Sequence, residues 1–128
     1  MNPTEVVQKV YAAFGAGDGP ALVALAAPDS TWVVNAPSEH PYGGRFVGVA
    51  GLQQFLGAIA TNVAIEAFGV DRLLAAGDDV FVVGHETGRW RRSGRAYTVR
   101  WMHHFRVERG RVAAFEEWFD TATALAAR

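Results

Sequence analysis

The hydrophobic positions of the chain change their spacing near residue 62, and the change divides the expected secondary structure into two parts. Before it, apolar residues recur every three or four positions, which predicts helices. The first helix is expected to follow Thr4 as its N-cap and to end at the glycines of residues 15–17. Pro20 opens a short second helix over residues 21–27, and a third helix is expected over residues 50–62.

Strands account for the rest of the pattern. Residues 31–36 are rich in β-branched and aromatic side chains, which predicts a strand, whereas the prolines and glycines of residues 37–49 predict a loop. Further strands are expected after residue 62, over residues 64–76, 80–90, 96–108 and 111–120. Helices followed by a run of strands with short turns are typical of the α+β class, so we expect three N-terminal helices packed on one face of a curved antiparallel sheet.

The last two strands carry the candidate chemistry. With a period of two, one face is apolar except for one histidine and one carboxylate, and the other face is polar. The apolar face consists of Trp101, His103, Phe105, Val107, Ala113, Phe115, Glu117 and Phe119. An apolar wall that contains two titratable groups is typical of a small-molecule pocket, so His103 and Glu117 are the candidate catalytic residues.

The turn between these two strands leaves two registers open. In a three-residue loop with Gly110 in the left-handed bulge position, Val107 pairs with Arg111, and His103 and Glu117 become diagonal neighbours on one face. In a two-residue turn, Glu108 pairs with Arg111, and Glu117 points away from the apolar face. The glycine favours the first register. An alternative without catalysis also stays open, in which the two residues are only a polar pair in the core.

Aromatic residues are expected to line the pocket around this pair, namely Trp32, Tyr42, Phe55, Trp101, Phe105, Phe115 and Phe119. His85 is placed with them, because it shares a face with Phe81 and Val83 when the strand is taken with a period of two. No local spacing of His, Asp and Glu marks a metal site, and none is expected. Asp120 is expected to cap a short C-terminal helix over residues 121–127.

Composition and charge restrict the partners. At 128 residues the chain is expected to form one domain, residues 1–128. Its net charge is −1 and no run of Lys and Arg is interleaved with aromatic residues, so no nucleic-acid partner is expected. The chain has no cysteine, which excludes disulfides and thiolate chemistry. It shows neither a secretory signal pattern nor an apolar run of membrane-spanning length, so we expect a cytoplasmic protein without membrane contact.

Three segments carry a family resemblance: residues 6–18 (VVQKVYAAFGAGD), residues 41–56 (PYGGRFVGVAGLQQFL) and residues 106–122 (RVERGRVAAFEEWFDTA). Together they resemble the SnoaL-like proteins of the nuclear-transport-factor-2-like superfamily, to which ketosteroid isomerases are related. The resemblance covers about residues 5–123. It implies a cone-shaped curved sheet with a central cavity, and a homodimer formed through the sheet. Trp118 is the expected centre of that contact, on a polar face that also carries His104, Arg106 and Glu116.

The resemblance transfers only some functional residues. Asn35 stands where ketosteroid isomerases have a general-base aspartate, and Val10 stands where they have an oxyanion-hole tyrosine, with Tyr11 one place away. His103 matches their second oxyanion-hole group. In SnoaL-like polyketide cyclases, the acid/base aspartate and its histidine fall at or next to Glu117 and His103.

These observations predict a small-molecule pocket protein, an acid/base enzyme of the isomerase or cyclase type that needs no cofactor. It would remove a proton next to a carbonyl group of a small apolar substrate, with Glu117 transferring the proton and His103 orienting it or stabilising the enolate oxygen. Two alternatives remain. One is a non-catalytic binder of an apolar ligand, and the other is a hydrolase or dehydratase that acts on an epoxide or alcohol in the same pocket.

Overall fold

The computed structural model describes residues 1–128, the whole of the sequence. Four helices and six strands follow one another as α1 (Pro3–Gly15), α2 (Gly19–Ala24), β1 (Ala26–Asn35), β2 (Gly44–Val47), α3 (Gly48–Asn62), β3 (Val63–Ala76), β4 (Asp79–Trp90), β5 (Ala96–Glu108), β6 (Arg111–Phe119) and α4 (Thr121–Ala126). None of the helices is both long and apolar enough to cross a membrane.

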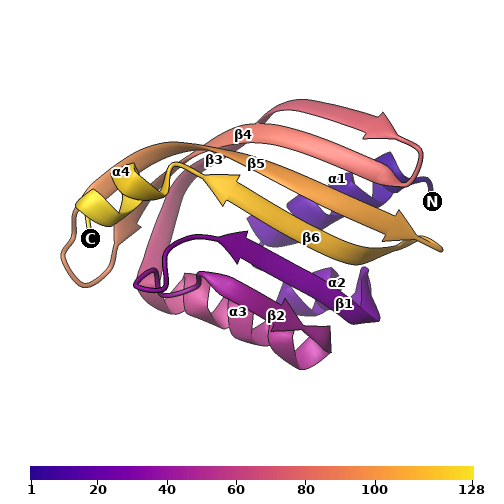
Figure 1. Ribbon diagram of the computed structural model, residues 1–128, viewed down its shortest axis with the longest axis horizontal. Helices are drawn as coiled ribbons and strands as arrows, with labels where there is room; N and C mark the ends of the chain where they lie inside the picture. The colour runs from indigo at the N-terminus through magenta and orange to yellow at the C-terminus, as the bar shows by residue number, and fades with distance from the viewer.

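One curved sheet, with the strand order β2-β1-β6-β5-β4-β3, organises the molecule (Figure 1). Helix α1 packs across β3 to β6, and α3 packs against β1, β2 and β3. The expected α+β fold, with a curved sheet wrapped around three N-terminal helices, is confirmed. Every pair of neighbouring strands is antiparallel except β1 and β6, which run parallel because the first strand pairs with the last.

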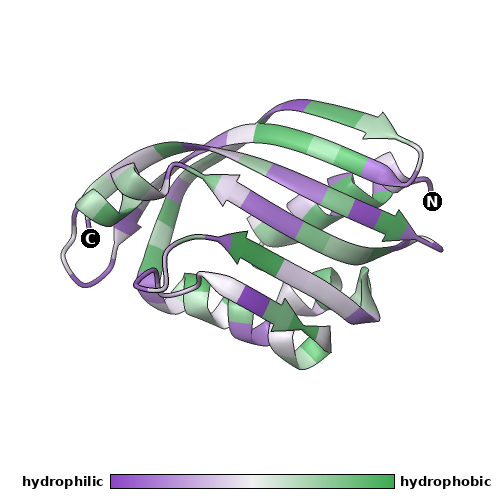
Figure 2. Cartoon of the chain, viewed as in Figure 1, coloured by the Kyte–Doolittle hydropathy of each residue, from purple (hydrophilic) through white to green (hydrophobic).

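Strand β5 has the clearest separation of a buried face from an exposed face. Its even-numbered and odd-numbered residues differ sharply in exposure, and the buried set includes Tyr97, Val99, Trp101, His103, Phe105 and Val107. Figure 2 shows this alternation as purple and green bands toward the C-terminal end of β5. Because the large apolar residues of β5 other than Met102 occupy one face, the sequence determines both the strand and the face that packs against the helices.

The first helix begins two residues earlier than the sequence indicated. Asn2, not Thr4, is the N-cap: its side chain accepts the backbone N–H of Glu5 at 2.8 Å, and the Glu5 carboxylate accepts the backbone N–H of Asn2 at 3.4 Å. This reciprocal capping box leaves Thr4 inside the helix, with Pro3 in the first turn. At the other end of the chain, Asp120 caps α4 as expected, by accepting the Thr123 N–H at 3.1 Å.

The segment between β1 and α3 contains a strand as well as a loop. Residues 44–47 form β2, which pairs with β1 at the edge of the sheet, with Phe46 opposite Trp32. The prediction of a loop over all of residues 37–49 is therefore wrong from residue 44 on, because residues 48 and 49 already belong to α3. The short strand stands among glycines and prolines, and its pairing with β1 is a tertiary contact that local sequence does not show.

Candidate active site

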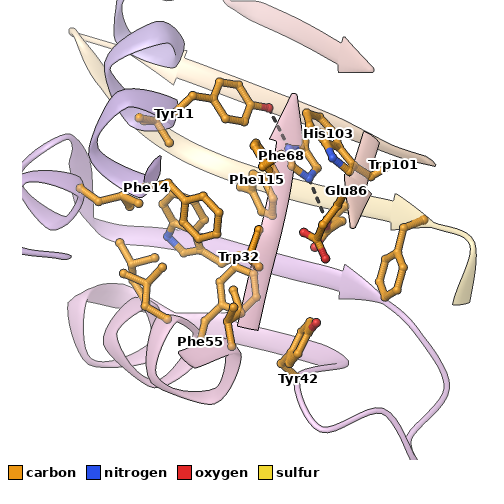
Figure 3. Close-up of a pocket in the computed structure, with 18 of the residues that line it drawn as sticks. Tyr11, Phe14, Trp32, Tyr42, Phe55, Phe68, Glu86, Trp101, His103 and Phe115 are labelled. Atoms are coloured by element: carbon orange, nitrogen blue, oxygen red, sulfur yellow. Dashed lines mark hydrogen bonds and ion pairs between the residues drawn. The ribbon is translucent and has the colours of Figure 1, made fainter. Parts of the chain in front are cut away.

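A pocket lies between the concave face of the sheet and helices α1 and α3 (Figure 3). Its volume is about 70 Å³, several times the roughly 10–15 Å³ that one buried water needs. Its walls are hydrophobic, and apart from tyrosines the only ionisable side chains among them are Glu86, His103 and Glu117. Three polar groups in an apolar wall can fix the orientation of a small ligand.

An outer hollow between α1, α2, α3 and β3 adjoins the pocket and shares six apolar lining residues with it: Phe14, Leu22, Leu56, Ile59, Ile65 and Phe68. The hollow also carries the carboxylates of Asp18 and Glu66. Where the hollow and the pocket meet, the shared side chains offer no hydrogen bonds, which favours an apolar molecule over a charged one.

A bulge in β6 places Glu117 in the pocket. Strands β5 and β6 are joined by a two-residue turn, in which Arg109 and Gly110 have φ angles of 53° and 74°. After Val112 the register shifts, because Ala113 has no partner in β5. From there on the strands pair so that His103 lies directly opposite Glu117.

Neither register inferred from the sequence is therefore right. The turn is the two-residue turn, which by itself would point Glu117 away from the apolar face. The bulge at Ala113 reverses the facing of the rest of β6 and returns Glu117 to the concave side. His103 and Glu117 thus share one face, as a direct pair rather than as diagonal neighbours.

Tyr11, His103 and Glu117 form a hydrogen-bonded chain (Figure 3). The Tyr11 hydroxyl lies 2.7 Å from Nδ1 of His103, and Nε2 of His103 lies 2.9 Å from Oε2 of Glu117. Burial, and after it the charge of Glu117, raises the pKa of Tyr11 above its ordinary value, so the hydroxyl keeps its proton and donates to Nδ1. A neutral imidazole then carries its proton on Nε2 and donates to Glu117. Oε1 of Glu117 makes no hydrogen bond within the protein.

Aromatic rings fix the orientation of the His103 imidazole. Its ring stacks on Trp101, with ring centroids 4.0 Å apart and an angle of 15° between the planes. Phe115 lies 4.8 Å from it on the neighbouring strand, and Phe105 lies 6.2 Å away with its edge toward it. With 5% of its surface exposed, His103 is held by packing as well as by its two hydrogen bonds.

The other aromatic residues expected in the pocket are found there. The lining includes Trp32, Tyr42, Phe55, Trp101, Phe105, Phe115 and Phe119. Trp32 has its own polar partner, since its Nε1–H donates to the Ser30 hydroxyl at 2.9 Å. Trp101 has none: its Nε1–H is buried and unpaired.

His85 does not line the pocket, and its placement there was wrong. Its side chain is 50% exposed on the opposite face of β4, where Nδ1 lies 2.9 Å from Oδ1 of Asp71. Phe81, the residue that appeared to define an apolar face with His85, is itself exposed. Residues 80–83 are all apolar, so this strand has no alternation from which the buried face could be identified.

The face of β4 that does enter the pocket carries Glu86, which the sequence reasoning missed. The Tyr97 hydroxyl donates to Oε2 of Glu86 at 2.7 Å. Burial raises the pKa of Glu86 to about 7; the hydrogen bond from Tyr97 opposes this shift and the charge of Glu117 adds to it. The available indication was the pair of glycines two residues to either side, Gly84 and Gly88, because glycines in a strand often mark close approach of other groups.

Tyr11 was also missed, because the comparison with ketosteroid isomerases placed the tyrosine position at Val10. Val10 and Tyr11 both line the pocket, and only Tyr11 reaches His103. Asn35, at the position of the isomerases' base, points elsewhere: its amide donates to Oε2 of Glu116 at 2.9 Å and to the backbone oxygen of Glu117 at 3.1 Å.

His40 is a buried histidine beside the site. Burial lowers its pKa to about 4, so the imidazole is neutral at physiological pH. Its Nδ1 accepts the backbone N–H of Tyr42 at 3.4 Å, its Nε2 has no partner, and its ring contacts Tyr42 and Phe119 edge-on. His40 thus supports two lining residues from behind.

The pocket offers neither a metal site nor a cationic side chain. No group of three His, Asp or Glu side chains is arranged to hold a metal ion. No arginine or lysine is part of the lining. The arrangement that the pocket offers is therefore a carboxylate, an imidazole and tyrosine hydroxyls within an apolar wall, which is suited to proton transfer.

Comparison with known proteins identifies relatives of this chain. The model of the SnoaL-like domain family matches residues 7–115. An NTF2-like protein from Burkholderia xenovorans is 30% identical, with a TM-score of 0.88 over 98% of this chain and 94% of that chain. TerC, whose crystal structure was determined after co-crystallisation with polyporic acid, is 25% identical, with a TM-score of 0.87 over 98% and 96% of the two chains.

A third solved structure shares the fold. A proposed polyketide cyclase from Pseudomonas putida is 23% identical, with a TM-score of 0.81 over 99% of this chain and 98% of that chain. Among curated proteins, none matches the sequence.

Proposed function

The chain belongs to the SnoaL-like domain family, and we propose that it is an acid/base enzyme of the isomerase or cyclase type that needs no cofactor. Glu117 removes a proton from the carbon next to a carbonyl group, which leaves an enolate. In an isomerisation, the same carboxyl group returns the proton to another carbon; in a cyclisation, the enolate carbon forms the new bond. Neither route needs an oxidant or a reductant.

The observation that carries this proposal is the hydrogen-bonded chain of Tyr11, His103 and Glu117. Glu117 is held through Oε2 while Oε1 is left without a protein partner, so one oxygen is available to the substrate. Its side chain is 16% exposed. The surrounding wall is apolar and excludes most water, so water is a weak competitor of the substrate for the proton that Glu117 carries. A base that is oriented in this way can transfer protons repeatedly without rearranging its surroundings.

The substrate class follows from the lining. Trp101, Phe115 and Trp32 offer flat aromatic surfaces, and most of the lining is hydrophobic, so we propose a flat and mostly apolar carbonyl compound. The names of structural relatives, among them a proposed polyketide cyclase and the TerC protein co-crystallised with polyporic acid, support this class.

Proton exchange into a simple ketone tests the proposal. The probe is 2-tetralone in deuterated buffer near neutral pH, and the readout is the loss of proton NMR signals from the CH₂ groups beside its carbonyl. We expect the protein to accelerate exchange over buffer, and Glu117→Gln to abolish the acceleration, because the amide keeps the shape and removes the base. Glu116→Gln is the matched control: Glu116 precedes Glu117 on β6 and instead accepts a hydrogen bond from Asn35.

The same experiment decides between the proposal and the binder. Trp32 and Trp101 line the pocket, so quenching of tryptophan fluorescence reports binding of the probe independently of exchange. Binding without acceleration would favour a non-catalytic binder. The hydrolase alternative lacks an arginine in the pocket to activate an epoxide or water, and nothing in the lining favours it.

We further propose a homodimer through the convex face of the sheet. Phe81, Met102 and Trp118 are exposed on that face, 42%, 39% and 37% respectively, and they stand on the neighbouring strands β4, β5 and β6. Beside them His104 and Arg106 bind Asp79, so that both signs of charge flank the apolar residues. A surface with both signs of charge around an apolar centre can pair with a second copy of itself across a two-fold axis.

A further inference from the structure

Glu86 is a second carboxyl group in the pocket, and the proton transfer proposed for Glu117 does not use it. It reaches the pocket from β4, whereas Glu117 reaches it from β6, with β5 between them. Its Oε2 accepts the Tyr97 hydroxyl at 2.7 Å, and Oε1 makes no hydrogen bond within the protein. Figure 3 shows Glu86 on the same side of the cavity as His103 and Trp101. An unused carboxyl oxygen in an apolar pocket needs a partner.

Two glycines create the space in which Glu86 stands. A Cβ atom on Gly84 would lie 2.2 Å from Cζ2 of Trp101, and a Cβ atom on Gly88 would lie 2.4 Å from the Tyr97 hydroxyl. The Trp101 and Tyr97 rings therefore lie over the bare backbone on either side of Glu86. Glu86 is the one side chain of β4 between these two rings, which hold it in a slot that faces the pocket.

This environment favours the protonated acid. The groups that act on Glu86 are Tyr97 from β5, which hydrogen-bonds to it, and Glu117 from β6, whose negative charge repels its ionised form; Tyr42, from the loop before β2, is a further ionisable group in the lining. No lysine or arginine lines the pocket to stabilise a second negative charge. Burial raises the pKa of Glu86 to about 7, so a large share of the protein carries a neutral carboxylic acid near neutral pH.

We propose that Glu86 is the hydrogen-bond donor for the ligand's carbonyl oxygen, and that the pocket therefore works with two carboxyl groups in different protonation states. Glu117, as carboxylate, takes the proton from carbon, while the O–H of Glu86 donates to the oxygen on which the enolate charge develops. When the proton returns from Glu117 to carbon, both carboxyl groups are restored, so the step balances. The role of Glu86 in catalysis rests on the proposed function, whereas its role in binding the carbonyl oxygen of the ligand does not.

The hydrogen bond proposed between Glu86 and the ligand also restricts the chemical class of the ligand. A protonated Glu86 offers a donor, and an ionised Glu86 offers only acceptors. A ketone, an aldehyde or an ester has only acceptor oxygens, so it requires the protonated form. The structure thus favours a ligand that presents a carbonyl oxygen to β4 and an acidic C–H group to β6.

The test measures 2-tetralone binding by tryptophan fluorescence from about pH 6 to about pH 8.5, in the wild type and in Glu86→Gln. We expect wild-type affinity to fall toward tenfold per pH unit above about pH 7, as the donor is lost. Glu86→Gln keeps an N–H donor that does not titrate, so its affinity should stay level across this range. Glu66→Gln is the matched control, since Glu66 lies exposed on β3 and pairs with Arg89.

Exchange of 2-tetralone protons, corrected for the buffer rate, gives the second readout. The wild-type rate should fall above about pH 7, and the Glu86→Gln rate should lose that decline. Glu86→Leu, which has no donor, should lower the rate about 100-fold at neutral pH, the usual effect of removing an oxyanion donor. Circular dichroism of each variant controls for folding.

The outcomes separate the two proposals. A wild-type affinity that does not change with pH, or one that changes equally in Glu86→Gln, would overturn the role of Glu86 even if exchange is catalysed. An affinity that depends on pH through Glu86 without any exchange would support Glu86 as the carbonyl donor and would overturn the proposed enzymatic function alone.

Discussion

Glu117 lies directly opposite His103 in the ladder between β5 and β6, with 2.9 Å between Oε2 of the carboxylate and Nε2 of the imidazole. The pairing depends on Ala113, the one residue of β6 without a partner in β5. Without that bulge, the two-residue turn would send Glu117 to the convex face and Glu116 to the pocket. One extra residue at the start of the strand thus decides which of two adjacent glutamates meets the histidine.

Removing the Tyr11 hydroxyl should weaken proton transfer without emptying the pocket. In Tyr11→Phe the ring contacts with Trp101 and Phe105 remain, but Nδ1 of buried His103 loses its donor. We expect the exchange rate with 2-tetralone to fall by about tenfold, because the tautomer that donates to Glu117 is no longer favoured. The free energy of unfolding should fall by about 1–3 kcal/mol, the cost of an unsatisfied buried acceptor.

Tyr97→Phe is the control for Tyr11→Phe, since it removes a tyrosine hydroxyl that binds Glu86 rather than His103. It should leave the His103–Glu117 pair intact and move the decline in 2-tetralone affinity to higher pH, because the hydrogen bond from Tyr97 lowers the pKa of Glu86. Equal effects of both variants on the exchange rate at neutral pH would contradict a separate role for Tyr11.

The sequence predicted the outline of the fold and part of the site, and the reasons differ from element to element. The bounds of β5 were predicted correctly because its large apolar residues alternate with polar ones along most of the strand. In β4 the four apolar residues 80–83 occupy both faces, so His85 was assigned to the pocket instead of Glu86. Apolar residues on the exposed face as well as on the buried face remove the pattern on which such predictions depend.

The bulge and the hydrogen-bonded chain could not be predicted from local pattern. Nothing in residues 111–115 distinguishes a regular strand from one with an extra residue, because bulges arise from how two strands fit together. Tyr11 was correctly placed on a helix, but its contact with His103 spans 92 positions in the sequence and depends on how α1 crosses the sheet. Tertiary packing decides both features, and both determine the chemistry.

Adding a methyl group at Gly84 should disrupt the pocket. The new Cβ atom would lie 2.2 Å from the Trp101 ring and 2.3 Å from the backbone oxygen of Gly69, so the ring that stacks on His103 and the β3 backbone both have to shift. We expect Gly84→Ala to lower the free energy of unfolding by about 1–3 kcal/mol and to weaken 2-tetralone binding, as measured by chemical denaturation and fluorescence. Gly57→Ala on α3 is the control, since its Cβ meets nothing within 4 Å and should stabilise the helix by roughly 0.5–1 kcal/mol.

The stability of the protein should depend on pH through two groups with opposite effects. The pKa of Glu86 is raised from 4.5 to about 7 in the fold, so the folded state binds more protons between these values and this contribution to stability is lost as pH rises through them. The pKa of His40 is lowered from 6.5 to about 4, so the unfolded state binds more protons there and stability increases with pH. In the wild type the two trends offset each other.

Single variants should separate the two trends. Relative to wild type, Glu86→Gln should gain stability as pH rises from about 4.5 to about 7, by up to about 3 kcal/mol, because 1 pKa unit corresponds to about 1.4 kcal/mol. His40→Asn, which keeps an acceptor for the Tyr42 N–H, should lose the rise with pH and show the decline due to Glu86. Urea denaturation at a series of pH values measures both, and a pH-independent difference between Glu86→Gln and wild type would show that Glu86 titrates normally.

The proposed dimer makes the last prediction. Trp118 has 37% of its surface exposed on the convex face, next to Met102 on the neighbouring strand. Substituting Trp118 by Glu places a charge at the centre of the proposed contact and should convert the dimer to a monomer in sedimentation velocity at micromolar concentration.

Val47→Glu is the control, because Val47 is more exposed, at 54%, but stands on β2 at the far edge of the sheet. A wild-type chain that sediments as a monomer would refute the dimer, and dissociation by both variants would place the contact elsewhere. The pocket faces the concave side, so a monomeric Trp118→Glu protein should still bind 2-tetralone with the affinity of the wild type.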